Sequence, residues 1–225
     1  YQRRDFAGIF KALDGLPATI RLLDPPLHEF LPHDAASQRD LAKKMGLTAS
    51  AISKRVEELH EFNPMLGHRG CRLAVTYPEI LVMQVSAIVE AMIECKRRRI
   101  DAKPEIMIPL VGLAEELRIA RERVVMVAES VIKEKGIEIE YSIGTMIELP
   151  RACVVADEIA QYADFFSFGT NDLTQTTLGL SRDDASKFLP AYIDYRILAN
   201  DPFVRLVTEG VGKLISLGIE RGKLQ

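Results

Sequence analysis

Apolar segments alternate with amphipathic segments along most of the chain. Short runs rich in apolar and β-branched residues predict buried strands at 18–23, 104–111, 138–149 and 165–168. A further short strand is expected just after the turn at 63–70. Helical periodicity fills the stretches between strands. The order of elements therefore predicts about five strands in a parallel sheet with helices outside it.

The longer helices are predicted at 78–99, 114–133, 151–162 and 201–220. Asp201 as a cap, followed by a proline, marks the start of the last one. The helix at 78–99 is expected to bury Leu81, Val85, Ile88, Met92 and Cys95. The helix at 114–133 is expected to bury Leu117, Ala120, Val124, Val127 and Val131.

Repeated strand–helix units in 225 residues fit two arrangements of one α/β domain spanning residues 1–225. One is an open doubly wound sheet. The other is a (β/α)8 TIM-type barrel that is incomplete in this chain, because a closed barrel takes about 250 residues. The pattern by itself does not separate them.

Two short helices at 37–45 and 48–59 form a hairpin that resembles a helix-turn-helix. Residues 37–60 hold five Lys or Arg against three Asp or Glu, a net charge of only +2. DNA-binding proteins carry a stronger basic surface. We interpret the hairpin as a helical insertion at about 35–62. A DNA-binding regulator that uses Lys43, Lys44 and Lys54 is the alternative.

Composition narrows the class of protein. The net charge is −3, so a nucleic-acid partner is not expected. No apolar run reaches the roughly 18 residues that span a bilayer, so no membrane association is expected. The cysteines, Cys71, Cys95 and Cys153, fit no metal motif and are expected to be small buried residues in a reducing compartment, the cytoplasm.

Polar residues follow the predicted strands at Arg21, Arg69, Glu148, Asn171 and Asp172. The carboxyl ends of parallel strands form the ligand face of α/β folds, so these side chains are expected to meet there. Glu148 and Asp172 lie about one strand–helix–strand unit apart and could share one Mg²⁺, which prefers oxygen ligands. Two solvated loop acids, or a carboxylate pair for glycoside hydrolysis, are the alternatives.

The arginines suit an anionic ligand. Arg21 and Arg69 could each bind a carboxylate or a phosphate through two hydrogen bonds, and Arg182 could add a third positive charge. The loop 169–172, which is Gly169, Thr170, Asn171 and Asp172, could bring backbone and amide groups close to an anion. Surface salt bridges and a simple turn are the alternatives.

Five segments together resemble the C-terminal barrel domain of the phosphoenolpyruvate-utilising enzymes: 19–30, 63–72, 105–109, 144–152 and 165–175. Segments 24–30, 68–71 and 181–184 favour the pyruvate, phosphate dikinase family over the related phosphoenolpyruvate synthases. The resemblance covers nearly the whole chain. It implies the TIM-type barrel rather than the open sheet, with its first and last strands absent here.

The resemblance also implies an activity and its residues. ATP, phosphate and pyruvate are converted reversibly to AMP, diphosphate and phosphoenolpyruvate, and the barrel carries out phosphoryl transfer between a phosphohistidine and pyruvate. By position, Glu148 and Asp172 match the Mg²⁺ ligands, and Arg21 and Arg69 match substrate-binding arginines. Gly169, Thr170 and Asn171 match the substrate loop, and Arg182 matches a phosphate-binding arginine.

The resemblance implies parts that this sequence does not carry. They are a catalytic cysteine loop, a phosphohistidine domain and a nucleotide-binding domain; no residue of this chain is therefore assigned as catalytic. We expect the chain alone to be inactive and the full-length enzyme to be a homodimer.

Overall fold

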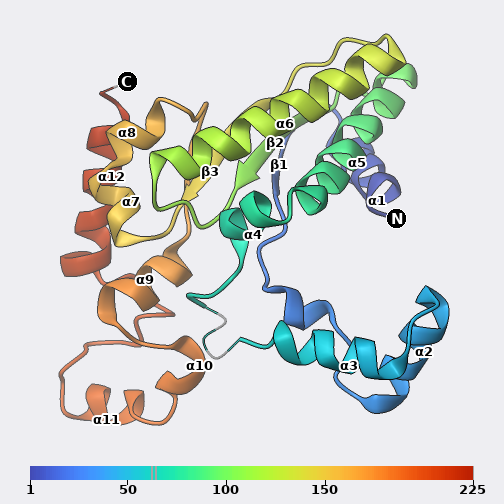
Figure 1. Ribbon diagram of the computed structural model, residues 1–225. Helices are drawn as coiled ribbons and strands as arrows, with labels where there is room; N and C mark the ends of the chain where they lie inside the picture. Colours follow the sequence, from blue (N-terminus) through green and yellow to red (C-terminus); the bar gives the residue numbers. More distant parts are fainter. Residues whose placement is uncertain (62, 64, 225) are drawn as a thin grey trace.

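The computed structural model describes residues 1–61, 63 and 65–224. A parallel sheet lies at its centre, with neighbouring strands in chain order: β1 (Pro17–Arg21), β2 (Lys103–Ile108), β3 (Ser142–Ile147) and β4 (Phe166–Phe168) (Figure 1). Parallel pairing of consecutive strands requires crossovers, and helices supply them. The predicted α/β class with a parallel sheet is confirmed. Phe62 and Pro64, in the predicted insertion and turn, and Gln225 lie outside the described residues.

The other regular elements of the described chain are helices, joined by turns and loops. The elements before β2 are α1 (Gln2–Leu13), η1 (Leu27–Phe30), α2 (Ala35–Met45), α3 (Ala49–Glu58), α4 (Gly70–Thr76) and α5 (Pro78–Arg97). Those after β2 are α6 (Ala114–Lys135), α7 (Pro150–Val154), α8 (Ala156–Ala160), α9 (Thr170–Leu178), α10 (Arg182–Ala185), α11 (Leu189–Asp194), η2 (Thr208–Gly212) and α12 (Lys213–Gly222).

The core lies between the sheet and helices α5 and α6. All ten apolar positions predicted for these two helices are buried, which confirms both stripes. Ala18 and Ile20 of β1 belong to the same core, whereas Pro17, Thr19 and Arg21 point to the other, exposed face. Burying each large apolar side chain contributes about 1.5–3 kcal/mol. Hydrophobic burial therefore covers one face of β1 and leaves its other face exposed, whereas β2 and β3 are buried on both faces over part of their length.

Four of the predicted strands are confirmed, although β3 is shorter than the predicted 138–149. The strand predicted after the 63–70 turn is wrong, because Gly70–Thr76 is helix α4. Gly70 has a φ of 57° and donates its N–H to the carbonyl oxygen of Asp24, so the chain turns sharply there. A short apolar run cannot be assigned to strand or buried helix from periodicity alone.

Two helix predictions also need correction. The predicted helix 151–162 is two short helices, α7 and α8, separated at Val155. The predicted start at Asp201 is wrong, since helical structure begins at Thr208. The side chain of Asp201 does accept a hydrogen bond from the N–H of Phe203 (2.8 Å), but it closes a turn rather than a helix.

Helices α2 and α3 pack against each other and project away from the sheet as an arm (Figure 1). Asp34 caps α2 by accepting from the N–H groups of Ala36 and Ser37, so this helix begins at Ala35 rather than at the predicted residue 37. Among the described residues, no single helix is long and apolar enough to cross a membrane; α4 and α5 meet that test only jointly, with a bend of 105° between them.

Candidate functional site

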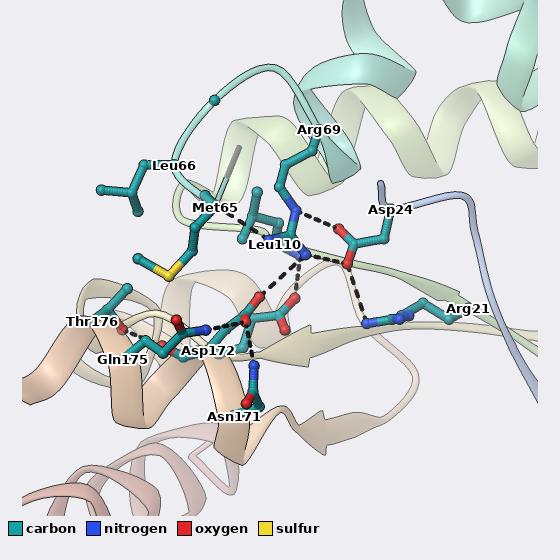
Figure 2. A network of polar contacts seen from close by, with 12 residues as sticks. Arg21, Asp24, Met65, Leu66, Arg69, Leu110, Asn171, Asp172, Gln175 and Thr176 are labelled. Carbon is teal, nitrogen blue, oxygen red and sulfur yellow. Dashed lines mark hydrogen bonds and ion pairs between the residues drawn. The ribbon is translucent and has the colours of Figure 1, made fainter. Parts of the chain in front are cut away.

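A cleft of about 740 Å³ opens at the carboxyl ends of the strands. Five of the predicted site residues line it: Arg21, Arg69, Asn171, Asp172 and Arg182. They reach it from segments far apart in the sequence, as the close-up of four of them shows (Figure 2). Arg21 ends β1, Arg69 precedes α4, and Asn171 and Asp172 lie in the first turn of α9. Four of the five side chains that were expected to meet at the strand ends therefore line this one cleft, and the exception is Glu148.

Arg69 lies at the centre of this cluster, between two carboxylates (Figure 2). Its Nε lies 3.2 Å from Oδ1 of Asp24, and its Nη2 also binds Oδ2 of Asp24. The same Nη2 lies 3.3 Å from Oδ2 of Asp172. Burial lowers the pKa of Arg69, whereas the neighbouring carboxylates of Asp24 and Asp172 raise it by more. The net shift is upward, so the guanidinium stays charged.

Asp172 is fixed by two amides as well as by Arg69. Its Oδ1 accepts hydrogen bonds from Nδ2 of Asn171 (3.0 Å) and Nε2 of Gln175 (3.3 Å). Its position in the first turn of α9 places a carboxylate at the positive end of the helix dipole. The sequence Gly-Thr-Asn-Asp after β4 thus orients this carboxylate toward the cleft.

Arg182 is tied to the same two amides. Its Nη1 donates to Oδ1 of Asn171 (2.8 Å), and its backbone N–H donates to Oε1 of Gln175 (2.8 Å). The guanidinium lies 5.8 Å from the ring centroid of Phe203, in cation–π range. Asn171 and Gln175 each accept a hydrogen bond from Arg182 through the side-chain oxygen and donate one to Asp172 through the side-chain NH₂ group. This arrangement couples the position of a cation to that of an anion.

Glu148 lies beneath the cleft and is not among its lining residues, with only 2% of its surface exposed. Its Oε1 accepts from the N–H of Leu110 (2.6 Å), a residue whose φ of 60° costs about 1–3 kcal/mol in a non-glycine residue. The pKa of Glu148 is raised to about 7, mainly by burial. The hydrogen bond from Leu110 lowers this pKa, whereas the negative charges of Asp172 and Asp24 raise it.

Gly169 is required for the close approach of β4 to Glu148. A Cβ atom at Gly169 would lie 2.6 Å from Oε2 of Glu148 and 2.7 Å from Sδ of Met146. Gly169 and Thr170 are not among the lining residues of the main cleft. Thr170 lines an adjoining hollow of about 280 Å³ together with Asn171 and Arg182.

Two polar residues of the cluster were not singled out from the sequence. Asp24 is 3% exposed and contacts both Arg69 and Arg21, whose Nη1 lies 3.2 Å from its Oδ2. Gln175 is also buried. Asp24 begins an Asp-Pro-Pro sequence, which we interpreted only as the end of a strand. Its position three residues after a strand-end arginine could have indicated an ion pair with that arginine.

A metal ion in the described chain would have at most two carboxylate, imidazole or thiolate ligands from the protein. No group of three or more His, Cys, Asp or Glu side chains is arranged to hold a metal ion among the described residues. Glu148 and Asp172 are close enough for Asp172 to raise the pKa of Glu148. A cation there would take two protein carboxylates and complete its shell with ligand or water oxygens, which suits Mg²⁺.

The cysteines and the arm supply no further site. Cys71, Cys95 and Cys153 are free and buried, as predicted, and burial raises the pKa of each thiol. On the arm, Lys44 pairs with Asp40 at 2.7 Å and Lys54 lies 3.9 Å from Glu58. These acids reduce the positive potential that a DNA-binding hairpin would need.

Comparison with known proteins fits this geometry. Residues 1–224 match the family model described as "PEP-utilising enzyme, PEP-binding domain". The chain is 58% identical to a pyruvate, phosphate dikinase of Clostridium symbiosum over 224 residues, which are 99% of the chain and 26% of that protein. It is 58% identical to one of Giardia intestinalis over 223 residues, 99% of the chain and 25% of that protein.

A plant relative agrees with these. The chain is 54% identical to a chloroplastic pyruvate, phosphate dikinase of Mesembryanthemum crystallinum over 225 residues, 99% of the chain and 24% of that protein. The chain spans about a quarter of the length of these curated relatives. By the match of the family model to nearly all its residues, the chain belongs to the phosphoenolpyruvate-binding domain family of the phosphoenolpyruvate-utilising enzymes.

Proposed function

We propose that this chain is the phosphoenolpyruvate- and pyruvate-binding domain of a pyruvate, phosphate dikinase. The observation that carries the proposal is the convergence of Arg21, Arg69 and Arg182 with Asp172 on one cleft at the strand ends. In this proposal the domain transfers a phosphoryl group between a phosphohistidine of another domain and pyruvate. The overall reaction converts ATP, phosphate and pyruvate to AMP, diphosphate and phosphoenolpyruvate.

The arginines bind and orient the anionic substrate. Arg21 is half-exposed at the cleft, and its remaining N–H groups are available to a carboxylate. Arg182 lines the same cleft beside the amide of Asn171, where it suits a phosphoryl group. Phosphoryl transfer needs positioning and charge neutralisation more than covalent help, and fixed donors supply both.

Glu148 and Asp172 are the residues that would hold Mg²⁺. They offer hard oxygen donors. Burial raises the pKa of Glu148 to about 7, and the charges of Asp172 and Asp24 add a smaller rise, so a cation bound there would favour the ionised carboxylate. When bound, Mg²⁺ stabilises negative charge on substrate oxygens as a Lewis acid. Asn171 and Gln175 hold Asp172 in place from the side opposite to Arg69.

The four strands belong, in this proposal, to a (β/α)8 TIM-type barrel that is completed in the full-length enzyme. Residues 1–225 form part of that barrel domain, and α2 and α3 belong to a helical insertion at about 35–62. The partners are the phosphohistidine and nucleotide-binding domains and a second subunit of a homodimer. We propose the cytoplasm as the compartment, in line with three buried free thiols.

The test is calorimetric titration of the full-length protein with oxalate, a mimic of enolpyruvate, with and without Mg²⁺. Asp172→Asn should weaken the Mg²⁺-dependent binding by roughly 100-fold or more, because a carboxylate ligand is lost. Asp101→Asn is the matched control, since Asp101 precedes β2 at the opposite end of the sheet. Equal binding by wild type and both variants, or none by folded wild type, would contradict the proposal.

A further inference from the structure

Asp24 is a charged residue that lines the cleft and is nonetheless almost fully buried. Its carboxylate is 4% exposed, and both of its oxygens contact arginines of the cleft. Its backbone oxygen also accepts from the N–H of Gly70, the residue after Arg69. One residue therefore holds both the side chain of Arg69 and the backbone that carries it.

The geometry determines which part of Arg69 remains free. Asp24 binds Arg69 along the edge formed by Nε and Nη2. A guanidinium has five N–H donors in a fixed plane, so occupying this edge turns the Nη1 end away from Asp24. The contacts of that end are weaker: Nη1 lies 3.4 Å from the backbone oxygen of Met65, which lines the cleft. The free end is thus aimed at the place of a ligand.

The same carboxylate fixes the second arginine. Oδ2 of Asp24 contacts Nη1 of Arg21 at 3.2 Å as well as Nη2 of Arg69 (Figure 2). Arg21 is 45% exposed, so without this contact its long side chain would sample many rotamers. A shared anchor sets the spacing between the two cations. That spacing determines whether both can bind one small anion.

We propose that Asp24 is a positioning residue that orients Arg21 and Arg69 for the carboxylate of the substrate. The inference rests on the proposed function, because it assigns a role within the same site. In this proposal Asp24 acts through the two arginines that its carboxylate contacts, rather than by binding the ligand. As a positioning residue, Asp24 strengthens the binding of an anionic ligand. Its negative charge alone would weaken that binding, because an anion beside the cleft repels an anionic ligand.

The positioning role and the charge of Asp24 therefore predict opposite results for one variant. Asp24→Asn removes a negative charge with almost no change of shape. If Asp24 acts only as a charge, oxalate should bind the variant more tightly. If it positions the arginines, the dissociation constant for oxalate with Mg²⁺ should rise roughly 10- to 100-fold, and KM for phosphoenolpyruvate should rise more than kcat falls.

The experiment uses the full-length protein and includes Arg69→Lys alone and combined with Asp24→Asn. Lysine cannot use the Nε edge, so the effect of Asp24→Asn should shrink at least several-fold in that background. Fully additive effects, or unchanged or tighter binding by folded Asp24→Asn, would overturn the inference. Wild-type binding of oxalate with Mg²⁺ is measured in parallel, and its absence would instead remove the proposed function.

A second variant covers loss of folding, because Asp24 is buried. Asp24→Glu keeps the charge but moves it by one methylene group. If Asp24→Asn does not show a cooperative melt, Asp24→Glu carries the test. Weaker oxalate binding by a folded Asp24→Glu supports positioning, since the net charge is unchanged; wild-type affinity would overturn it.

Discussion

The two ends of the parallel sheet hold similar residues in different environments. The carboxyl end has a cleft of about 740 Å³, and the amino end has a hollow of about 610 Å³ lined by Lys96, Asp101, Lys103 and Glu105 among others. Both are rich in charge. At the amino end, Lys103 and Asp101 pair at 3.1 Å with side chains that are 55% and 62% exposed. At the carboxyl end, the side chains of Arg69 and Asp24 are 13% and 4% exposed.

Burial, rather than the presence of charge, distinguishes the end of the sheet at which the candidate site lies. An exposed ion pair is screened by water and contributes about 0–1 kcal/mol. A buried cluster loses hydration, so each charge depends on its partners and is held in one geometry. Charges that are costly to bury and fixed in direction are those that can orient a ligand.

Removing one partner from the buried cluster should have the largest effect. Arg69→Met leaves Asp24 as a buried charge with only Arg21 as its partner, and should lower the free energy of unfolding by about 3–5 kcal/mol. Lys103→Met at the amino end should change it by about 0.5 kcal/mol or less. Urea unfolding at pH 7.5 measures both. Similar losses at the two ends would break the comparison.

The pH dependence of stability should reveal Glu148. Its pKa is raised from 4.5 to about 7 in the folded protein, so folding favours the protonated carboxyl. Its contribution to stability is full below about pH 4.5 and is lost as the pH rises to about 7. Glu148→Gln should therefore stabilise the metal-free protein at pH 8 by about 1–3 kcal/mol and have little effect near pH 4.5.

The matched control for this titration is Glu140→Gln. Glu140 is exposed at the amino end of the sheet, so its replacement removes one charge without removing a buried group. Thermal melts of the three proteins between pH 4.5 and pH 8 provide the measurement. A Glu148→Gln variant with the wild-type pH profile would show that Glu148 ionises normally in the fold.

A methyl group at Gly169 should disturb the site by a smaller amount. In Gly169→Ala the added Cβ would clash with Glu148 and Met146, so stability should fall by about 1–2 kcal/mol. Gly8→Ala, on α1, meets nothing within 4 Å and should raise stability by about 0.5–1 kcal/mol. Differential unfolding of the two variants measures the contrast, and effects of the same sign would count against it.

The arm should give the smallest effect, because we expect no specific DNA binding. Its lysines at 44 and 54 lie beside acids of their own helices. Fluorescence anisotropy with duplex DNA at 50 and 200 mM salt should show no saturable binding above nonspecific levels. Saturable, salt-dependent binding that is lost in the combined Lys43→Ala, Lys44→Ala and Lys54→Ala variant would restore the helix-turn-helix interpretation.

Much of the architecture was predictable because it depends on local periodicity. The buried stripes of α5 and α6 and four of the about five predicted strands follow from apolar spacing and are confirmed. The strand-end positions of Arg21, Asn171 and Asp172 follow from the same pattern and place these residues on one cleft. The errors at α4 and at Asp201 concern short segments, where capping signals and apolar runs are compatible with several structures.

The α/β class and the edge at which polar residues gather could therefore be predicted from the sequence, because both depend on the order of apolar and polar positions along single segments. Which charges are buried, and which partners they have, are properties of the assembled fold. Asp24 contacts Arg69 across 45 positions of sequence, and Leu110 donates to Glu148 across 38. Such contacts depend on how separate elements pack, and packing is a property of the whole core rather than of any one segment.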